Sequence, residues 1–339
     1  MDLSVIISAC NMQRHVAACL RSVTRCPRDT IHMECIVVSE DDRNETAAIV
    51  NRYIERDSRI RLVTVRSGAA VEVRNEGIEA AQGTYILFLD ADSRLCEDAW
   101  EQIEAAVEEE YADFVAFSSI TARRSGKLVA QMLPIADVVS NDPDEARRLM
   151  HTGSALRTCE GKLFKGRIIR DNNILFRTEL STGGDFMFVA EYFEHSESYL
   201  LTKAMILYCP RRDANIWKNY SMEESIARIG AVYDFHTDVV GRYHDSALTA
   251  CVRVYYLDML MTLLGTYERA YSYSRAALET LYENALRDKF VKRLLCEVDE
   301  RMIRSGMLKY EYRLLRQGSP AKLRKYFAIR ALLPVADRI

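Results

Sequence analysis

Two carboxylates follow an apolar run in the first third of the chain. Asp90 and Asp92 come directly after residues 87–89, Leu-Phe-Leu, which have the composition of a buried strand. Side chains alternate between the two sides of an extended chain, so a turn is needed for both carboxylates to approach one ligand. Mg²⁺ combines one or two carboxylates with substrate phosphates and water. The Asp-x-Asp pattern therefore predicts a site for a metal-bound diphosphate, with a solvated acidic loop as the alternative interpretation.

Short apolar runs alternate with segments of helical spacing around these carboxylates. Runs typical of buried strands in a mostly parallel sheet occur at residues 5–7, 35–38, 60–65, 85–89 and 114–117. Between them apolar residues recur every three or four positions, which predicts amphipathic helices; the first such face holds Val16, Cys19, Leu20 and Val23. This alternation is typical of a doubly wound α/β domain, a Rossmann-like sheet with flanking helices. Ligands of such domains bind outside the carboxyl ends of the strands, where Asp90 and Asp92 are expected.

Four segments accompany the Asp-x-Asp pattern in a characteristic order. They are residues 4–11, 37–46, 73–78 and 81–85. In order and spacing they resemble the inverting family 2 glycosyltransferases. The GT-A fold of that family is a nucleotide-binding α/β domain that uses a sugar nucleotide and usually a divalent metal. The resemblance is strong over residues 3–118, weaker over residues 161–208, and absent after about residue 220.

This resemblance implies roles for five residues in the first half of the domain. Ser8, at the end of the first strand, would contact the nucleoside. Glu40 stands where the family usually has an Asp that accepts a hydrogen bond from the uracil N–H, which any carboxylate can do. Arg74 would complement the charge of the nucleotide, and Asp90 would face the ribose or the donor sugar. Asp92 would hold Mn²⁺ or Mg²⁺, which neutralises charge on the departing diphosphate.

The turn after the second predicted strand departs from the family pattern. Residues 39–42 read Ser-Glu-Asp-Asp, where the family has Asp-Asp-Gly-Ser, so the glycine is missing. Because its side chain is longer than that of the Asp in the family, Glu40 would shift the base outward or select a different nucleotide. The family resemblance makes UDP the expected donor nucleotide, and the altered turn leaves the identity of its base open.

Asp185 is the expected catalytic base, because it aligns with that residue of the family. Gly184 precedes it, where many relatives have an acidic residue. An Asp is ionised at pH 7. A sugar hydroxyl becomes acidic only as it attacks the anomeric carbon, so a positioned carboxylate suffices as base, and attack opposite the diphosphate inverts that centre. The alternative role for Asp185 is the N-cap of the apolar helical stretch that follows.

Three residues further along are weaker candidates. Arg211 and Arg212 follow residues 207–208, near the place where many relatives have a Tyr-x-Arg segment. They either reach a phosphate or face solvent. Trp217 either stacks on an acceptor sugar or seals the helical region that follows.

Composition excludes several classes of protein. The 339 residues are 49% apolar with 14 Gly and 6 Pro, which excludes collagen-like and disordered chains, and a net charge of −3 does not indicate a nucleic-acid binder. Nine Cys without a Cys-x-x-Cys pair favour free thiols in a reducing cytoplasm over a disulfide framework or zinc cluster. The polar residues close to the start argue against a signal peptide, and no apolar run approaches the ~20 residues of a bilayer span.

The last part of the chain is expected to be a helical appendage. Residues 1–218 are assigned to the catalytic domain, with a nucleotide-sugar-binding half at 1–118 and an acceptor-side half at 119–218. Residues 219–339 are assigned to the helical region with a basic tail. The tail has no acidic residue from position 312 to 336, and its apolar component comes from Leu323, Tyr326, Phe327, Leu332 and Leu333. The tail is expected either to bind an anionic membrane surface or to dock on the acidic catalytic domain.

The resemblance thus implies a metal-dependent glycosyltransferase, and the sequence favours the cytoplasm or the inner membrane face as its location. It would move a sugar from a nucleoside diphosphate to a hydroxyl of a glycan or lipid-linked acceptor, as in cell-surface polysaccharide synthesis. The alternatives are a nucleotide-sugar-binding protein without transferase activity and a nucleotidyltransferase of similar architecture. The second is expected to carry a Gly-rich basic loop, which residues 8–13 lack. The sugar, the acceptor, the linkage and the oligomeric state stay open.

Overall fold

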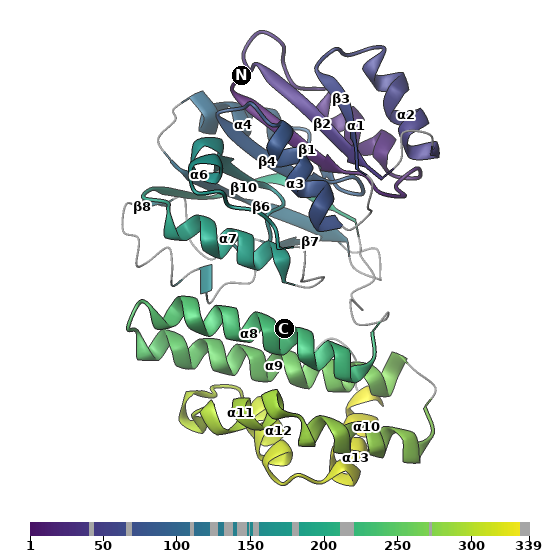
Figure 1. Ribbon diagram of the computed structural model, residues 1–339, viewed down its shortest axis with the longest axis vertical. Helices are drawn as coiled ribbons and strands as arrows, with labels where there is room; N and C mark the ends of the chain where they lie inside the picture. Colours follow the sequence, from purple (N-terminus) through teal and green to yellow (C-terminus); the bar gives the residue numbers. More distant parts are fainter. Residues whose placement is uncertain are drawn as a thin grey trace. The chain divides into compact units, whose positions relative to one another are not determined.

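The computed structural model divides the chain into two compact units, Met1–Arg212 and Asp213–Ile339 (Figure 1). The domain boundary predicted at residue 218 falls among residues 211–219, which the structure does not describe, so it stays a prediction. The described residues are 1–40, 44–65, 70–108, 112–122, 128–131, 138–140, 148, 150–151, 156–177, 183–210, 220–270 and 273–332.

The first unit is built around one mixed β-sheet (Figure 1). Its strands are β1 (Leu3–Ser8), β2 (Met33–Ser39), β3 (Ile60–Thr64), β4 (Tyr85–Asp90), β5 (Arg94–Leu95), β6 (Phe114–Ala122), β7 (Leu128–Gln131), β8 (Val138–Ser140), β9 (Lys162–Lys165) and β10 (Tyr199–Cys209). The strand order is β3-β2-β1-β4-β9-β6-β10-β5, with β7 beside β6 and β8 beside β10. Strands β1 to β4 are parallel, and β9 runs antiparallel to both of its neighbours.

Helices cover both faces of this sheet. They are α1 (Val16–Val23), α2 (Glu45–Ile54), α3 (Ala70–Ala80), α4 (Ala99–Glu108), α6 (Gly166–Asp171) and α7 (Gly184–Glu194). Alternate residues of β1 point to opposite faces: Val5 lies in the core formed with α1 and α4, and Ile6 faces α3. A Cβ on Gly77 of α3 would overlap the Ile6 side chain, so glycine lets α3 lie close to the sheet.

The predicted α/β alternation is confirmed. The five strands expected from the sequence correspond to β1, β2, β3, β4 and β6, and helices lie between them. The apolar face predicted for α1 is fully buried. Its four residues, Val16, Cys19, Leu20 and Val23, are all inaccessible to solvent. The first unit therefore has the doubly wound architecture that places ligands at the carboxyl ends of the strands.

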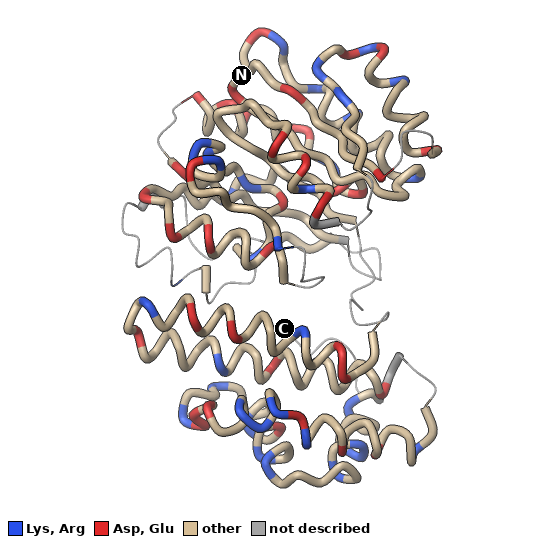
Figure 2. Tube along the Cα trace, in the orientation of Figure 1, with Lys and Arg blue, Asp and Glu red and all other residues tan. Residues whose placement is uncertain are grey.

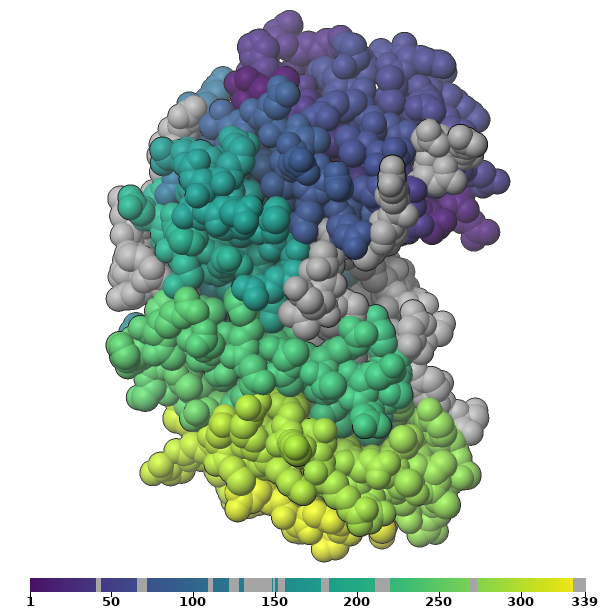
Figure 3. Space-filling model, in the orientation of Figure 1, coloured from purple at the N-terminus to yellow at the C-terminus, as the bar shows by residue number. Residues whose placement is uncertain are grey.

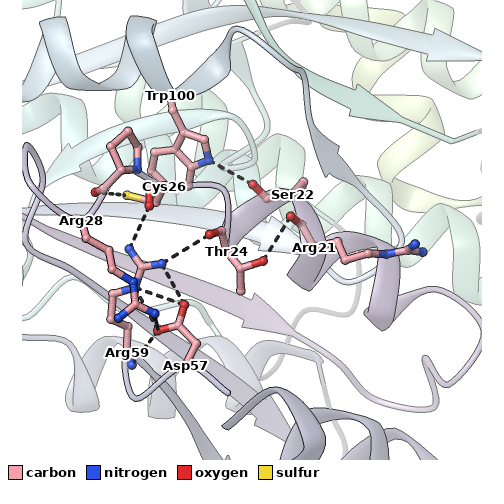
Figure 4. Close-up of polar contacts among 9 residues, drawn as sticks. Arg21, Ser22, Thr24, Cys26, Arg28, Asp57, Arg59 and Trp100 are labelled. Carbon is pink, nitrogen blue, oxygen red and sulfur yellow. Dashed lines mark hydrogen bonds and ion pairs between the residues drawn. The ribbon is translucent and has the colours of Figure 1, made fainter. Parts of the chain in front are cut away.

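A largely buried ion pair fixes the turn before β3 (Figure 4). The Arg59 guanidinium donates from Nη2 to Asp57 Oδ2 at 2.8 Å. It also donates to the backbone carbonyls of Thr24 at 3.4 Å and Cys26 at 3.1 Å. The pair thus ties the loop after α1 to the turn that leads into β3.

Replacing Asp57 with asparagine is expected to destabilise the first unit by about 3 kcal/mol, because the Arg59 charge loses its buried partner. Hydrogen bonds from Arg59 lower the pKa of Asp57. The stabilisation is therefore complete above the unfolded carboxyl pKa of about 3.9 and is lost as pH falls through the folded-state value. Urea unfolding at neutral and acidic pH measures this difference, with exposed Asp29→Asn as the matched control. A difference that stays constant down to about pH 2 contradicts the assignment.

The second unit is helical in its described residues. Its elements are α8 (Met222–Gly241), α9 (Ser246–Ala270), α10 (Arg275–Arg287), α11 (Lys289–Glu297), the 3₁₀ helix η2 (Glu300–Met302), α12 (Gly306–Arg316) and α13 (Pro320–Leu332). Helix α9 is central, because α8, α10, α11, α12 and α13 all contact it. The helices predicted around residues 226–233, 252–263 and 278–286 are confirmed as α8, α9 and α10.

Helix α9 corrects one expectation from the sequence. Among the described residues it is the one helix long and apolar enough, by length and composition, to cross a membrane, over Ser246–Glu268. Leu257, Leu260 and Leu264 are buried inside the unit. The central helix of a small helical unit is apolar on most sides because neighbours surround it, and this packing accounts for the composition of α9.

The basic tail also differs from expectation. Leu323 and Phe327 of α13, two of the apolar residues assigned to membrane contact, are buried. Arg324 pairs with Glu279 of α10 at 2.9 Å. Helix α13 is therefore docked through this side on helices of its own unit, since it contacts α9, α10 and α12.

Candidate active site

The ends of β1 and β4 bring two predicted residues together. Ser8 and Asp90 are the last residues of these parallel strands and are partners in the register. The Ala91 N–H donates to the Ser8 carbonyl at 3.1 Å, and the Ser93 N–H donates to the Asp90 carbonyl at 2.9 Å. These bonds form the turn that carries Asp92. The turn required by the Asp-x-Asp prediction is therefore present.

Glu40 lies at the same edge of the sheet. It follows Ser39, the last residue of β2, and its carboxylate is close to Cys10, which follows β1. Burial, and then the nearby Glu40 charge, raise the pKa of Cys10 to about 11, so this thiol is protonated at neutral pH. Ser8, Glu40 and Asp90 are thus on neighbouring strand ends, as predicted.

Arg74 binds two carboxylates that were predicted to belong to the site and that come from distant parts of the chain. Its guanidinium donates from Nη2 to Asp90 Oδ1 at 2.9 Å and from Nη1 to Asp185 Oδ1. The side chain of Arg74 is 13% exposed and that of Asp185 is 29% exposed, so the cluster reaches solvent mainly at Asp185. The sequence predicted that Arg74 complements a nucleotide; in this structure its charge is directed to two carboxylates.

Asn75 fixes the helix that presents Arg74. Its side-chain amide exchanges two hydrogen bonds with the backbone of Phe176, both at 2.8 Å. The Arg74 guanidinium lies over the Phe176 ring, 5.2 Å from the ring centre, a cation–π arrangement. Phe176 in turn stacks on Phe188 of α7 with ring centres 4.2 Å apart. The Arg-Asn pair therefore links α3 to the helix whose first turn carries Asp185.

Asp185 is not the N-cap of α7. The N-cap is Gly183, whose φ of 82° suits glycine, and no side chain caps the helix there. Asp185 Oδ2 instead accepts hydrogen bonds from the backbone N–H and the thiol of Cys159, both at 3.4 Å. Burial acts to raise the pKa of the Asp185 carboxyl, but Arg74 and Cys159 outweigh it and hold the pKa below its ordinary value. The carboxylate is therefore ionised at neutral pH, as a general base must be.

Two buried charged residues beside this cluster were missed by sequence reasoning. Glu160 accepts a hydrogen bond from the Asp90 N–H at 3.1 Å. Lys162 Nζ donates to the Thr158 hydroxyl at 3.1 Å and to the Glu160 carbonyl at 3.2 Å, and burial lowers the pKa of Lys162 to about 8. The sequence feature that could have indicated them is residues 160–164, Glu-Gly-Lys-Leu-Phe, in which two charged residues surround a glycine directly before two apolar residues.

The carboxylates fit a metal only together with further ligands. Within the part of the chain that the structure describes, no group of three or more His, Cys, Asp and Glu side chains is placed to hold a metal ion. Asp90 is engaged by Arg74, and Asp92 lies in the turn beyond β4. One carboxylate with phosphate oxygens and water is a donor set that Mg²⁺ accepts. Asp92 is therefore suited to a cation that arrives with a diphosphate.

Three further candidate residues lie in a segment that the structure does not describe. Arg211, Arg212 and Trp217 belong to residues 211–219, between β10 and α8, which lie outside the described residues. Their roles toward phosphate or acceptor stay predictions.

Comparison with known proteins places the chain in a family. Residues 4–178 match the family model described as Glycosyl transferase family 2. EpsH of Bacillus subtilis (strain 168) is 26% identical over 205 residues, which are 59% of this chain and 58% of EpsH. TarS of Staphylococcus aureus (strain Mu50), named a poly(ribitol-phosphate) beta-N-acetylglucosaminyltransferase, is 21% identical over 257 residues, which are 73% of this chain and 43% of TarS. The chain thus spans about half the length of these curated relatives.

A solved structure extends the likeness in fold. The crystal structure of S. aureus TarS 1–349 in complex with UDP-GlcNAc matches with a TM-score of 0.67 at 16% sequence identity, and the match covers 97% of this chain and 91% of the other. The match runs past residue 220, where the sequence alone showed no resemblance. Because the family model covers more than half of the 339 residues, the chain belongs to glycosyl transferase family 2, with the GT-A fold in its first unit.

Proposed function

We propose that the protein transfers a sugar from a UDP-linked donor to an acceptor hydroxyl with inversion at the anomeric carbon. The observation that carries this proposal is the Arg74-held carboxylate of Asp185 next to the strand-end carboxylate of Asp90. A match to a structure of TarS 1–349 with UDP-GlcNAc supports a UDP-sugar donor. Glu40 is the residue through which this chain would read the base, by accepting a hydrogen bond from the uracil N–H.

Asp185 supplies the base in this proposal. The acceptor hydroxyl approaches Asp185, and its proton passes to the carboxylate as the oxygen bonds to the anomeric carbon. Arg74 and Cys159 keep the carboxylate ionised and oriented before that transfer. The diphosphate leaves from the opposite side of the ring, so the configuration inverts. The Asp185 side chain is 29% exposed, so an acceptor can reach it from solvent.

Asp92 is the residue proposed to hold Mn²⁺ or Mg²⁺ together with the donor diphosphate. When bound, the cation would neutralise charge on the departing nucleoside diphosphate as a Lewis acid. Ser8 and Asp90, on adjoining strand ends, would then position the nucleoside and the ribose or sugar.

The proposed acceptor is a hydroxyl of a glycan or of a lipid-linked glycan in cell-surface polysaccharide synthesis. Relatives named for transfer to poly(ribitol phosphate) support this class, among them TarS and a poly(ribitol-phosphate) beta-glucosyltransferase of Bacillus spizizenii. The cytoplasm is the proposed compartment, since all nine cysteines are free thiols, which suits a reducing environment.

The metal assignment predicts that Asp92→Asn loses the Mn²⁺-dependent part of UDP binding, because that carboxylate links cation and protein. Calorimetric titration of UDP with and without Mn²⁺ measures it, in wild type and variant. Asp98→Asn, which changes a carboxylate on the way to α4, is the matched control and is expected to bind as wild type does. Equal metal-dependent affinity in Asp92→Asn and wild type removes Asp92 from the site.

A screen of donor hydrolysis across UDP-, GDP- and TDP-sugars with Mn²⁺ tests the function as a whole. Release of UDP from UDP-sugars above the other donors is the expected result. Binding of UDP without release of nucleotide or transfer to any hydroxyl would instead fit a binding protein and contradict the proposed reaction.

A further inference from the structure

The end of the helical unit has an excess of positive charge. Residues 301–332 contain nine Lys and Arg and one Asp or Glu, although the whole chain has a net charge of −3. The one acidic residue, Glu311, is buried and is paired with Arg330. Figure 2 shows the resulting blue segments along α12 and α13, and Figure 3 shows these C-terminal helices, in yellow, as a continuous surface of the unit.

Large apolar side chains are exposed on the same two helices. Met307 is 44% exposed, Tyr310 is 56% exposed and Ile329 is 55% exposed. Tyr310 of α12 and Tyr326 of α13 lie side by side, with ring centres 5.6 Å apart. Met307 precedes Tyr310 by about one helical turn, and Ile329 follows Tyr326 by about one turn. Met307, Tyr310 and Ile329 therefore occupy the outward side of the two helices. Tyr326, whose hydroxyl donates to the buried Glu311, lies at the edge of this side.

Lysines flank this apolar strip. Lys322 lies one turn before Tyr326 and Lys325 lies one turn before Ile329, and Lys309 directly precedes Tyr310 in the chain. Lys322 donates to the side chain of Gln317 at 2.9 Å, which leaves its charge uncompensated. Within the described residues no ion pair is formed by any of the three. We call Met307, Tyr310, Tyr326, Ile329, Lys309, Lys322 and Lys325 together the α12–α13 face.

The chemistry of this face selects among occupants. A soluble polyanion would bind the lysines but offers no apolar surface to Met307 and Ile329. A second copy of the chain would place the same lysines against each other in a two-fold contact, where like charges repel. A bilayer that contains anionic lipid meets both features, because its surface attracts lysines and its interface accepts tyrosine rings and aliphatic side chains.

We infer that the α12–α13 face binds the surface of a membrane rich in anionic lipid. Tyr310 would lie at headgroup level with Tyr326 at the edge of the contact, Met307 and Ile329 in the outer acyl region, and the three lysines near the phosphates. The inference does not depend on the transferase reaction, since none of these residues belongs to the proposed active site. It keeps Tyr326, Lys322 and Lys325 from the expectation for the tail, and leaves out Leu323 and Phe327, which are buried.

Sedimentation of the full chain with vesicles tests the inference. The wild type is expected to bind vesicles that contain phosphatidylglycerol and not vesicles of phosphatidylcholine alone. A charge variant, Lys309→Glu with Lys322→Glu and Lys325→Glu, is expected to lose binding by about tenfold or more. An apolar variant, Met307→Ser with Tyr310→Ser and Ile329→Ser, is expected to lose it to a similar extent.

A control variant and two further measurements keep the outcome clear. Arg242→Glu with Arg287→Glu changes exposed charges on α8 and α10 and is expected to bind vesicles as the wild type does. Circular dichroism and UDP titration establish that each variant is folded, independently of vesicle binding. Equal vesicle binding by the wild type and the charge variant overturns the inference. Loss of binding in the charge variant alone, with full binding by the apolar variant, overturns the insertion of Met307, Tyr310 and Ile329 and leaves a purely electrostatic contact with the lipid phosphates. A change of oligomeric state in the apolar variant, without a change in vesicle binding, overturns it in favour of self-association.

Discussion

The Asp185→Asn variant is expected to transfer sugar at least ~100-fold more slowly than the wild type, because loss of a general base costs ~10²–10⁴ in rate. Asparagine keeps the shape of the side chain and its contacts with Cys159 but cannot accept the proton. UDP and Mn²⁺ are expected to bind with wild-type affinity, since an interaction made mainly in the transition state contributes little to ground-state binding. Asp92→Asn, in contrast, is expected to lose both binding and transfer.

The measurement needs an identified acceptor, with transfer followed by mass spectrometry and binding by calorimetry. Asp171→Asn, at the end of α6 and outside the cluster, is the matched control and is expected to retain both properties. Near-normal transfer by Asp185→Asn would leave the base unassigned and reduce Asp185 to a residue that anchors Arg74.

The half of the site on β1 and β4 was predictable because it follows from local patterns. The apolar runs before Ser8 and Asp90 each have strand length, and parallel strands end at one edge of a sheet. In the folded sheet these two last residues are partners in the register of β1 and β4. Asp92 follows in the same way, once a turn is required after the strand.

The link between Arg74 and Asp185 was not predictable from periodicity. The two residues are 111 positions apart, and neither belongs to a repeating apolar pattern. Their contact depends on α3 lying close to β1 at Gly77 and on Asn75 binding the backbone of Phe176. Resemblance to a family named both residues, but their ion pair became visible only in the assembled fold.

The later strands were missed for physical reasons. Strand β9 has four residues, too few to show alternation, and it lies antiparallel between parallel strands. Strand β10 is long, but its pairing with β6 shifts register between Leu201 and Met205 and again before Leu207. Such irregularities break the period of two by which a strand is identified in a sequence.

Arg74→Gln is expected to slow transfer by about 100-fold, on the scale of the base that Arg74 holds. Without the guanidinium, burial raises the pKa of Asp185, which Arg74 and Cys159 lower in the wild type. Activity depends on the ionised carboxylate and is lost as pH falls through that pKa. The acid limb of the pH–rate profile is therefore expected to move to higher pH in this variant.

Arg74→Lys separates the charge of Arg74 from its geometry. Lysine keeps one positive charge but cannot contact Asp90 and Asp185 through two nitrogens of one planar group. It is therefore expected to return the acid limb toward the wild-type position while restoring only part of the rate. Circular dichroism identifies conditions in which both variants are folded, because removing one partner of a buried ion pair costs about 3–5 kcal/mol. A slower Arg74→Gln enzyme with an unmoved acid limb would show that Arg74 acts on the donor nucleotide and does not set the ionisation of Asp185.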